Sequence, residues 1–236
     1  MRVSLLNLRE YLVPDLVRLV YNTLNETDKR VIMHAHRHTL YKPIFFIYAD
    51  ILHCAENGYL KLLQWLCTNG WRHWDELTCI RAAGGGHLHV LQWARANGCP
   101  WDEQICSNAA YGWHLHVLQW ARANKCPWDS ATCNNAAYSG HLHVLQWARA
   151  NGCPWNKWTC AYAAKGGRLN ALQWARQYEC PWDLNTCTWA AVFGHLHVLQ
   201  WASANGCPWD RNYCLACAKK YNHLDVVTWI ETQVEK

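Results

Sequence analysis

Residues 126–152, CPWDSATCNNAAYSGHLHVLQWARANG, are one copy of a unit that repeats along most of this 236-residue chain. Its tripeptide Leu-Gln-Trp returns with a spacing of 27 or 28 residues. A fixed period of this length is typical of stacked repeats, in which each unit packs only against its neighbours. We therefore predict an array in place of a globule with one central core. The tryptophans of the tripeptide are Trp65, Trp93, Trp120, Trp147, Trp174 and Trp201, and the related Trp229 follows them.

Each unit is predicted to fold as two helices joined by a tight turn. Asp129 is a good N-cap for a first helix over residues 130–137, whose small cysteine and alanine side chains allow close helix packing. A second helix is predicted over residues 141–151, where Gly152 suits the left-handed position that ends a helix. Its leucine, valine and tryptophan side chains form one apolar face. A single unit cannot bury this face alone, so it must stack on its neighbours.

The unit resembles the ankyrin repeat over about residues 47–236, which gives seven units. The matching positions in one unit are Ala136-Ala137, Gly140-His141-Leu142, Val144-Leu145 and Gly152. The Thr-Pro-Leu-His turn of that family is replaced by residues 131–134, and the unit is about six residues shorter than the usual 33. The resemblance implies an all-α solenoid of αα-hairpins with almost no strand, which binds a protein target on its concave side. The Cys-Pro-Trp-Asp linker is similar to that of divergent ankyrin proteins of giant viruses and some protists.

Residues 1–46 do not follow the period and are predicted to form a separate helical segment. They resemble an F-box, although the usual Cys-Arg-x-Trp ending is echoed only by residues 36–38. The F-box resemblance implies docking to a Skp-type adaptor of cullin–RING ubiquitin ligases, while the repeats choose the substrate. The alternative is a helix pair that only caps the first repeat unit. The candidate adaptor-docking residues are Leu12, Pro14, Leu16, Leu19, Val20, Leu24, Val31 and Ile32.

The composition favours a folded, soluble protein. Hydrophobic residues make up 51% of the chain and charged residues 17%, which argues against disorder, and the net charge of +5 is mild. We find neither a membrane-spanning segment nor a signal peptide, so we expect an intracellular, cytoplasmic monomer (in the host cytoplasm if the protein is viral). The 14 cysteines mostly recur as pairs seven residues apart, and we expect them to be reduced and packed in the stack.

No motif predicts catalysis, a cofactor or a metal. The His-x-His pairs, such as His141 and His143, do not share one helix face, and the first histidine is placed to bond backbone or a neighbouring loop. Zinc sites usually need close cysteine pairs such as Cys-x-x-Cys, and cysteines seven residues apart do not have this spacing. Cys214 and Cys217 do have it, but a second such pair is missing from the sequence. The glycines at 84–86 lack the lysine and hydroxyl of a phosphate loop.

A ladder of arginines offers a second kind of binding surface. A stripe of positive charge could meet nucleic-acid phosphates. Each arginine, however, lies in the last turn of a helix, where a cation complements the helix dipole, and aspartates supply a counter-ladder, so we favour a structural role. The arginines are Arg95, Arg122, Arg149 and Arg176, and the aspartates are Asp102, Asp129, Asp183 and Asp210.

Specificity is expected at the positions where the units differ, namely the start of the first helix and the turn after it. Aromatic residues there are candidate anchors for a partner, because aromatic side chains dominate binding hot spots. The alternative is that they fill gaps between units. We interpret the chain as a non-enzymatic protein-binding module, either a ubiquitin-ligase substrate adaptor or a free-standing scaffold. The target-binding candidates are Tyr111, Trp113, Tyr138, Trp158, Lys165, Trp189, Phe193 and Tyr213.

Overall fold

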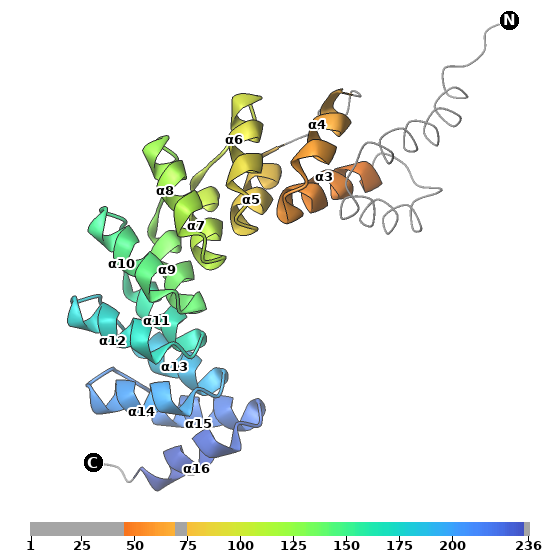
Figure 1. Cartoon of the computed structure of the whole chain (residues 1–236). Helices are drawn as coiled ribbons and strands as arrows, with labels where there is room; N and C mark the ends of the chain where they lie inside the picture. Colours follow the sequence, from red (N-terminus) through yellow and green to blue (C-terminus); the bar gives the residue numbers. More distant parts are fainter. Residues whose placement is uncertain (1–44, 69–74, 234–236) are drawn as a thin grey trace, which may run out of the picture.

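The computed structural model describes residues 45–68 and 75–233, which form 14 α-helices and no β-strand (Figure 1). These helices make seven αα-hairpins, which confirms the predicted all-α, ankyrin-like solenoid. The first helix begins at Phe45, two residues before the predicted start of the array. The F-box-like segment, with all of its candidate docking residues, lies outside the described residues, so its role stays a prediction.

The helices form two layers along a curved array (Figure 1). The first helices of the units line the inner, concave side. They are α3 (Phe45–Asn57), α5 (Glu76–Gly84), α7 (Glu103–Tyr111), α9 (Ser130–Ser139), α11 (Lys157–Lys165), α13 (Leu184–Val192) and α15 (Arg211–Lys220). The second helices form the outer layer. They are α4 (Leu60–Thr68), α6 (Leu88–Ala96), α8 (Leu115–Ala123), α10 (Leu142–Ala150), α12 (Leu169–Gln177), α14 (Leu196–Ala204) and α16 (Leu224–Thr232).

The inner helices begin at the predicted aspartate caps. In α9, the Asp129 side chain accepts a hydrogen bond from the backbone N–H of Ala131, which satisfies a donor that the first helical turn leaves unpaired. The same cap recurs at Asp75, Asp102, Asn156 and Asp183 and, shifted by one residue, at Asp210. Helix α9 runs to Ser139, two residues beyond the predicted end, and Gly140 then takes the left-handed conformation (φ 81°).

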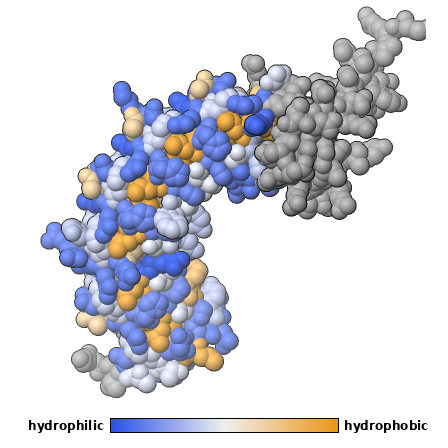
Figure 2. Space-filling view, in the orientation of Figure 1, coloured by the Kyte–Doolittle hydropathy of each residue, from blue (hydrophilic) through white to orange (hydrophobic). Residues whose placement is uncertain are grey.

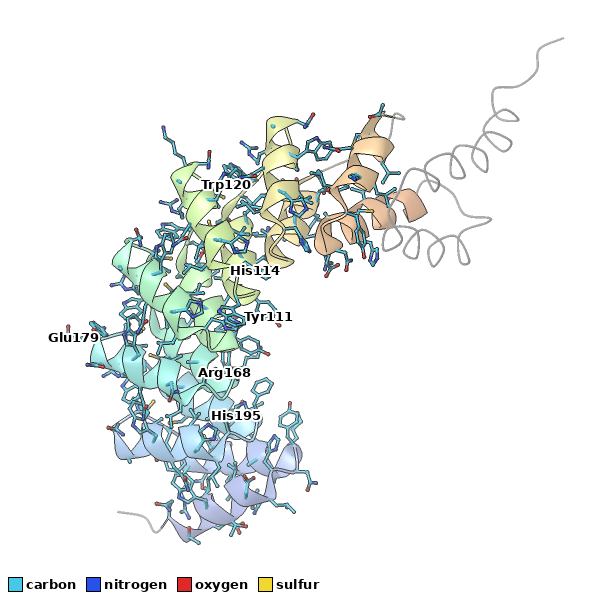
Figure 3. All side chains as sticks on the ribbon, in the orientation of Figure 1. Tyr111, His114, Trp120, Arg168, Glu179 and His195 are labelled. Atoms are coloured by element: carbon cyan, nitrogen blue, oxygen red, sulfur yellow. The ribbon has the colours of Figure 1, made fainter. Side chains whose placement is uncertain are left out.

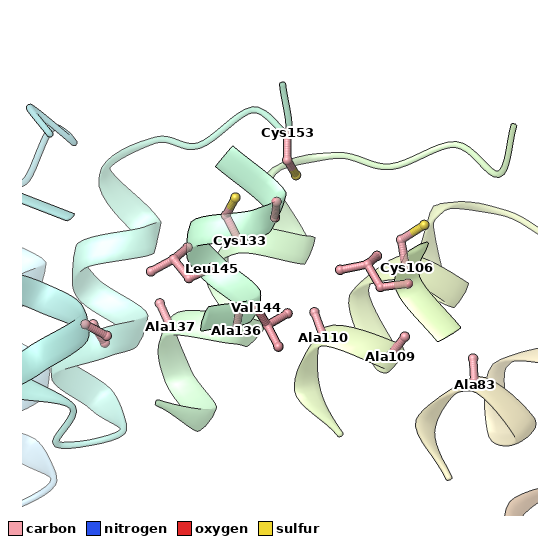
Figure 4. Close-up of a cluster of buried hydrophobic side chains, with 14 of the residues drawn as sticks. Ala83, Cys106, Ala109, Ala110, Cys133, Ala136, Ala137, Val144, Leu145 and Cys153 are labelled. Atoms are coloured by element: carbon pink, nitrogen blue, oxygen red, sulfur yellow. The ribbon is translucent and has the colours of Figure 1, made fainter. Parts of the chain in front are cut away.

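The core lies between the two layers and continues from unit to unit (Figure 4). Ala136 and Ala137 of α9 and Val144 and Leu145 of α10 are fully buried. Alanines on the inner helices leave room for the next inner helix, and consecutive inner helices pack directly against one another. Five of the Leu-Gln-Trp tryptophans pack against this core from its edge, which confirms their predicted role in stacking; they are Trp93, Trp120, Trp147, Trp174 and Trp201.

The cysteines fill the seam between units, as expected for a packing role. All 14 lie in the part of the chain that the structure describes, and none forms a disulfide; each is buried except Cys217, which is half-buried. The thiols that face each other are 20 residues apart in the sequence. For example, the Sγ of Cys79 donates to the Sγ of Cys99, 2.8 Å away. The Sγ of Cys153 also donates to the carbonyl oxygen of Asp129 in the preceding linker, 3.3 Å away. The seven-residue spacing in the sequence is therefore a repeat position and not a contact.

Candidate functional site

The histidine pairs bind the backbone of the preceding unit. The Nε2 of His195 donates to the carbonyl oxygen of Lys165 (3.0 Å), and that of His197 donates to Gly167 (3.2 Å). Three other units make one of these two contacts, each to a carbonyl oxygen 30 or 31 residues earlier in the chain. The donors are His89, His116 and His223. The predicted bond to neighbouring backbone is confirmed. Within the described residues, no group of three or more His, Cys, Asp or Glu is arranged to hold a metal ion.

Burial lowers the pKa of the first histidine in several pairs, because a partly buried imidazole is desolvated and resists protonation. We call these residues the N-cap histidines, since each stands at the start of an outer helix. They are His87, His114, His141 and His195.

The arginine ladder holds the linkers in place. The Nη1 of Arg149 donates to the carbonyl oxygen of Cys153 (2.8 Å), and its guanidinium carbon lies 4.2 Å from the ring centroid of Trp155. The other three arginines make the same pair of contacts, four and six residues ahead. The predicted aspartate counter-ladder was wrong, since the aspartates cap helices instead. Within the described ranges, ion pairs join only Arg81 to Glu56, Lys157 to Asp183 and Lys219 to Glu231.

Most of the candidate anchors meet on the concave side. Tyr111 of α7 stacks on Tyr138 of α9 (5.9 Å between ring centroids, 13° between planes). Tyr138 contacts Tyr162 of α11, which in turn lies 5.2 Å from Trp189 of α13. Trp158 contacts the same Trp189 at 5.5 Å. These side chains form a continuous row of rings over four units, and Phe193 adjoins the row through Lys165. We refer below to these rings and Phe193 as the aromatic cluster.

The 27-residue repeat explains why the side chains of the aromatic cluster lie together. Tyr111, Tyr138 and Lys165 occupy one position in three consecutive units, and Tyr162 and Trp189 occupy another position in two units. Because consecutive inner helices lie side by side, residues 27 apart become neighbours across the stack. Two columns of variable positions are thereby brought into one surface.

Lys165 lies within the aromatic cluster. Its ammonium nitrogen is 5.4 Å from the ring centroids of Trp189 and Phe193 and 5.7 Å from those of Tyr138 and Tyr162. These distances are within the range of cation–π attraction. No carboxylate of the described residues forms an ion pair with Lys165. The cation therefore faces aromatic rings from three units.

A cavity of about 570 Å³ opens beside Lys165 at the turns between inner and outer helices. Tyr111 and Arg168 lie toward the inner side of the arc, whereas Glu179 projects from its outer side (Figure 3). Hydrophobic residues form a broken row along the visible face, interrupted by hydrophilic ones (Figure 2). The cavity is lined by Tyr111, Tyr138, Ser139, His141, Lys165, Gly166, Arg168, Phe193 and His195.

Two candidates lie outside the aromatic cluster. Trp113 has φ 69° at a turn position where five other units have glycine with φ between 68° and 81°. Its ring stacks on His141 at 5.4 Å, and its Nε1 donates to the Nε2 of His143 (2.7 Å), so it bridges two units although its side chain is 61% exposed. Tyr213 is exposed in the first turn of α15 and does not line the cavity.

Six residues at this site were not among the sequence candidates, namely Ser139, His141, Tyr162, Gly166, Arg168 and His195. Arg168 stands where most other units have a histidine, and its Nε donates to the carbonyl oxygen of Tyr138 (3.2 Å). Aligning the repeat units shows that Arg168 replaces a histidine. The same alignment shows that Tyr162 and Trp189 occupy one repeat position. The two histidines carried no such signal, because they belong to the copied framework.

Membrane insertion has no support in the helices described, none of which is long and apolar enough to cross a bilayer. No protein-family model and no curated protein sequence matches the chain. Among solved structures, the chain is similar to the crystal structure of the human ASB11 ankyrin repeat domain, with a TM-score of 0.55 and 14% sequence identity. The match covers 78% of this chain and 99% of that domain. At this identity the likeness shows the fold, and the chain therefore has the architecture of an ankyrin repeat domain.

Proposed function

We propose that this chain is a non-enzymatic protein-binding module whose partner contacts the aromatic cluster on the concave face. The observation that carries the proposal is the cluster itself, because its large side chains are partly exposed and come from four consecutive units. Exposed aromatic groups that are fixed by their neighbours lose little conformational freedom on binding, which makes them effective contact residues. The ankyrin-like architecture supports the proposal by providing a rigid, curved surface.

The test compares partner binding by matched tyrosine variants. Tyr138→Ala removes a ring at the centre of the aromatic cluster, whereas Tyr178→Ala removes an exposed tyrosine that follows α12 in the outer layer. Proteins captured by the intact chain, identified by proximity labelling and then purified, should bind Tyr138→Ala at least about ten-fold more weakly. They should bind Tyr178→Ala normally. If the partner binds both variants equally well, the proposal that it contacts the concave face is wrong.

The second part of the proposal assigns residues 1–46 to recruitment of a Skp-type adaptor, so that the array would select substrates for a cullin–RING ubiquitin ligase. It rests on the F-box-like pattern of that segment. The intact chain should capture a purified Skp-type adaptor, and the variant Leu16→Asp/Leu19→Asp should not. Absence of capture by the intact chain would leave the free-standing scaffold. The cytoplasmic, monomeric and giant-virus-like assignments belong to the same proposal.

Deleting residues 1–42 separates the adaptor from the scaffold. If the segment only caps the first unit, its removal should sharply lower the melting temperature of the array, since an exposed repeat end is costly. If it is a docking module, melting should change little while adaptor binding disappears.

Nucleic-acid binding is the weaker alternative. The arginine ladder that motivated it is bound to linker carbonyl groups and tryptophan rings, so its guanidinium groups already have partners. Binding through phosphates would weaken steeply as salt is raised. Duplex binding with that salt dependence, lost in Arg149→Ala, would restore the alternative.

A further inference from the structure

The charges around the cavity beside Lys165 indicate which kind of protein segment could occupy it. Two permanent cations, Lys165 and Arg168, line the cavity, and no acidic side chain does. The aspartate caps of α9 and α13, Asp129 and Asp183, lie at the opposite helix ends, about 13–15 Å away for nine or ten residues. That separation exceeds the Debye length of about 8 Å at physiological salt, so the caps do little to neutralise the cavity.

The helix dipoles do not decide the sign of this site. Inner helices end at the cavity and outer helices begin there, so their partial charges oppose one another. Burial lowers the pKa of His141 and His195, which disfavours a positive charge on either imidazole. The two side-chain cations therefore dominate the local field.

Both cations are held where a ligand can reach them. The hydrogen bond from Arg168 Nε to Tyr138 uses one of its five N–H donors, and the Arg168 side chain is exposed. Lys165 is half-buried among rings that exclude part of its water, so a carboxylate that enters meets less screening than on an open surface. The rings of Tyr111, Tyr138 and Phe193 supply apolar walls beside the charges.

We propose that this cavity binds an acidic peptide segment of the partner, with a carboxylate between Lys165 and Arg168 and an adjoining apolar side chain against the aromatic walls. This inference rests on the proposed function and names the chemistry of the partner. The volume of about 570 Å³ lies within the range of about 300–1,000 Å³ that is usual for ligand pockets. This volume accommodates a few side chains of a peptide segment.

The repeat provides variants that remove charge while preserving the fold. Arg168→His introduces the residue that most other units carry at this position, and it retains a donor for the carbonyl of Tyr138. Lys165→Tyr introduces the residue of two preceding units. Lys125→Met, in an exposed outer turn, is the control for loss of a lysine charge.

The experiment is selection from a phage-displayed library of random dodecapeptides on the intact chain. Enriched peptides should carry more Asp and Glu than the input library, and their binding should weaken as salt is raised. Synthetic copies should bind Arg168→His and Lys165→Tyr about ten-fold more weakly each, and Lys125→Met normally. Failure to enrich any peptide, or enrichment without excess acidic residues, would overturn the inference.

A further comparison separates this inference from the proposed function. If enriched peptides lose binding in Tyr138→Ala but bind Arg168→His normally, the concave face remains the binding surface and only the acidic-ligand inference fails. Tighter binding of the single-stranded oligonucleotide dT12 than of every selected peptide would likewise overturn the inference in favour of a phosphate ligand. Loss of acidic-peptide binding in both Arg168→His and Lys165→Tyr would support the inference.

Discussion

Replacing Arg149 with alanine tests whether the arginine ladder holds the array together. The change removes a hydrogen bond from the guanidinium to the carbonyl oxygen of Cys153 (2.8 Å) and the stacking of that group over Trp155 (4.2 Å). It also removes methylene groups from the half-buried side chain. The linker between two units would lose both of its contacts with Arg149.

The expected cost follows from these contacts. A hydrogen bond involving a charged group contributes about 1.5–3 kcal/mol, and partial exposure of Arg149 places this bond toward the lower value. A cation–π contact at an exposed site adds about 0.5–1 kcal/mol. Together they predict a loss of about 2–3 kcal/mol in the free energy of unfolding. Arg149→Lys should recover less than half of it, because an ammonium lacks the planar fork that stacks and donates together.

The assay is urea unfolding, with the midpoint and slope measured for each variant. Lys61→Ala, which removes an exposed charge on the outer helix α4, is the control and should change stability by less than about 0.5 kcal/mol. Ser203→Arg should stabilise the array by about 0.5–1.5 kcal/mol, because Cys207 and Trp209 stand where the ladder would place its partners. A loss below about 0.5 kcal/mol for Arg149→Ala would refute this account of the ladder.

Three further predictions concern the core and its titratable groups. Leu145→Ala should cost about 2–5 kcal/mol in urea unfolding, whereas Leu184→Ala, at a side chain 50% exposed, should cost less than about 1 kcal/mol; similar losses would contradict the assigned core. Burial lowers the pKa of the N-cap histidines below the unfolded value of 6.5, so the unfolded chain binds more protons than the folded one in acid. The free energy of unfolding should therefore fall as the pH drops below 6.5. A free energy of unfolding that stays constant or rises between about pH 6.5 and pH 5 would contradict this. Reaction of the native protein with Ellman's reagent should show one fast thiol, lost in Cys217→Ser, because the other cysteines are buried and burial raises the pKa of Cys214 to about 11; several fast thiols would contradict the packing.

The helices could be predicted from the sequence because the repeat supplies their signals many times. Asp129 and Gly152 marked the beginning and end of a unit, and the structure places its helices within two residues of those predicted. The end of α9 was less certain, since residues 138 and 139 fit either the helix or the turn, and packing decided in favour of the helix.

The site was only partly predictable. Differences between units indicated Tyr111, Tyr138 and Lys165, but a list of variable positions does not say which side chains touch. Contact depends on how closely consecutive inner helices approach, and that distance is set by buried alanines across the stack. Arg168 was not among the candidates because it stands at a position where most units repeat a histidine, outside the positions where the units were expected to differ.

The most direct test of the central claim is site-specific photo-crosslinking in cells that express the intact chain. A photoreactive benzoylphenylalanine is placed at Tyr138 in the aromatic cluster and, separately, at Tyr178, a more exposed tyrosine next to the outer layer. If the concave face binds a protein, illumination should yield a discrete crosslinked partner from position 138 and none from position 178. A partner crosslinked from position 178 alone, or no crosslink from position 138, would contradict the account.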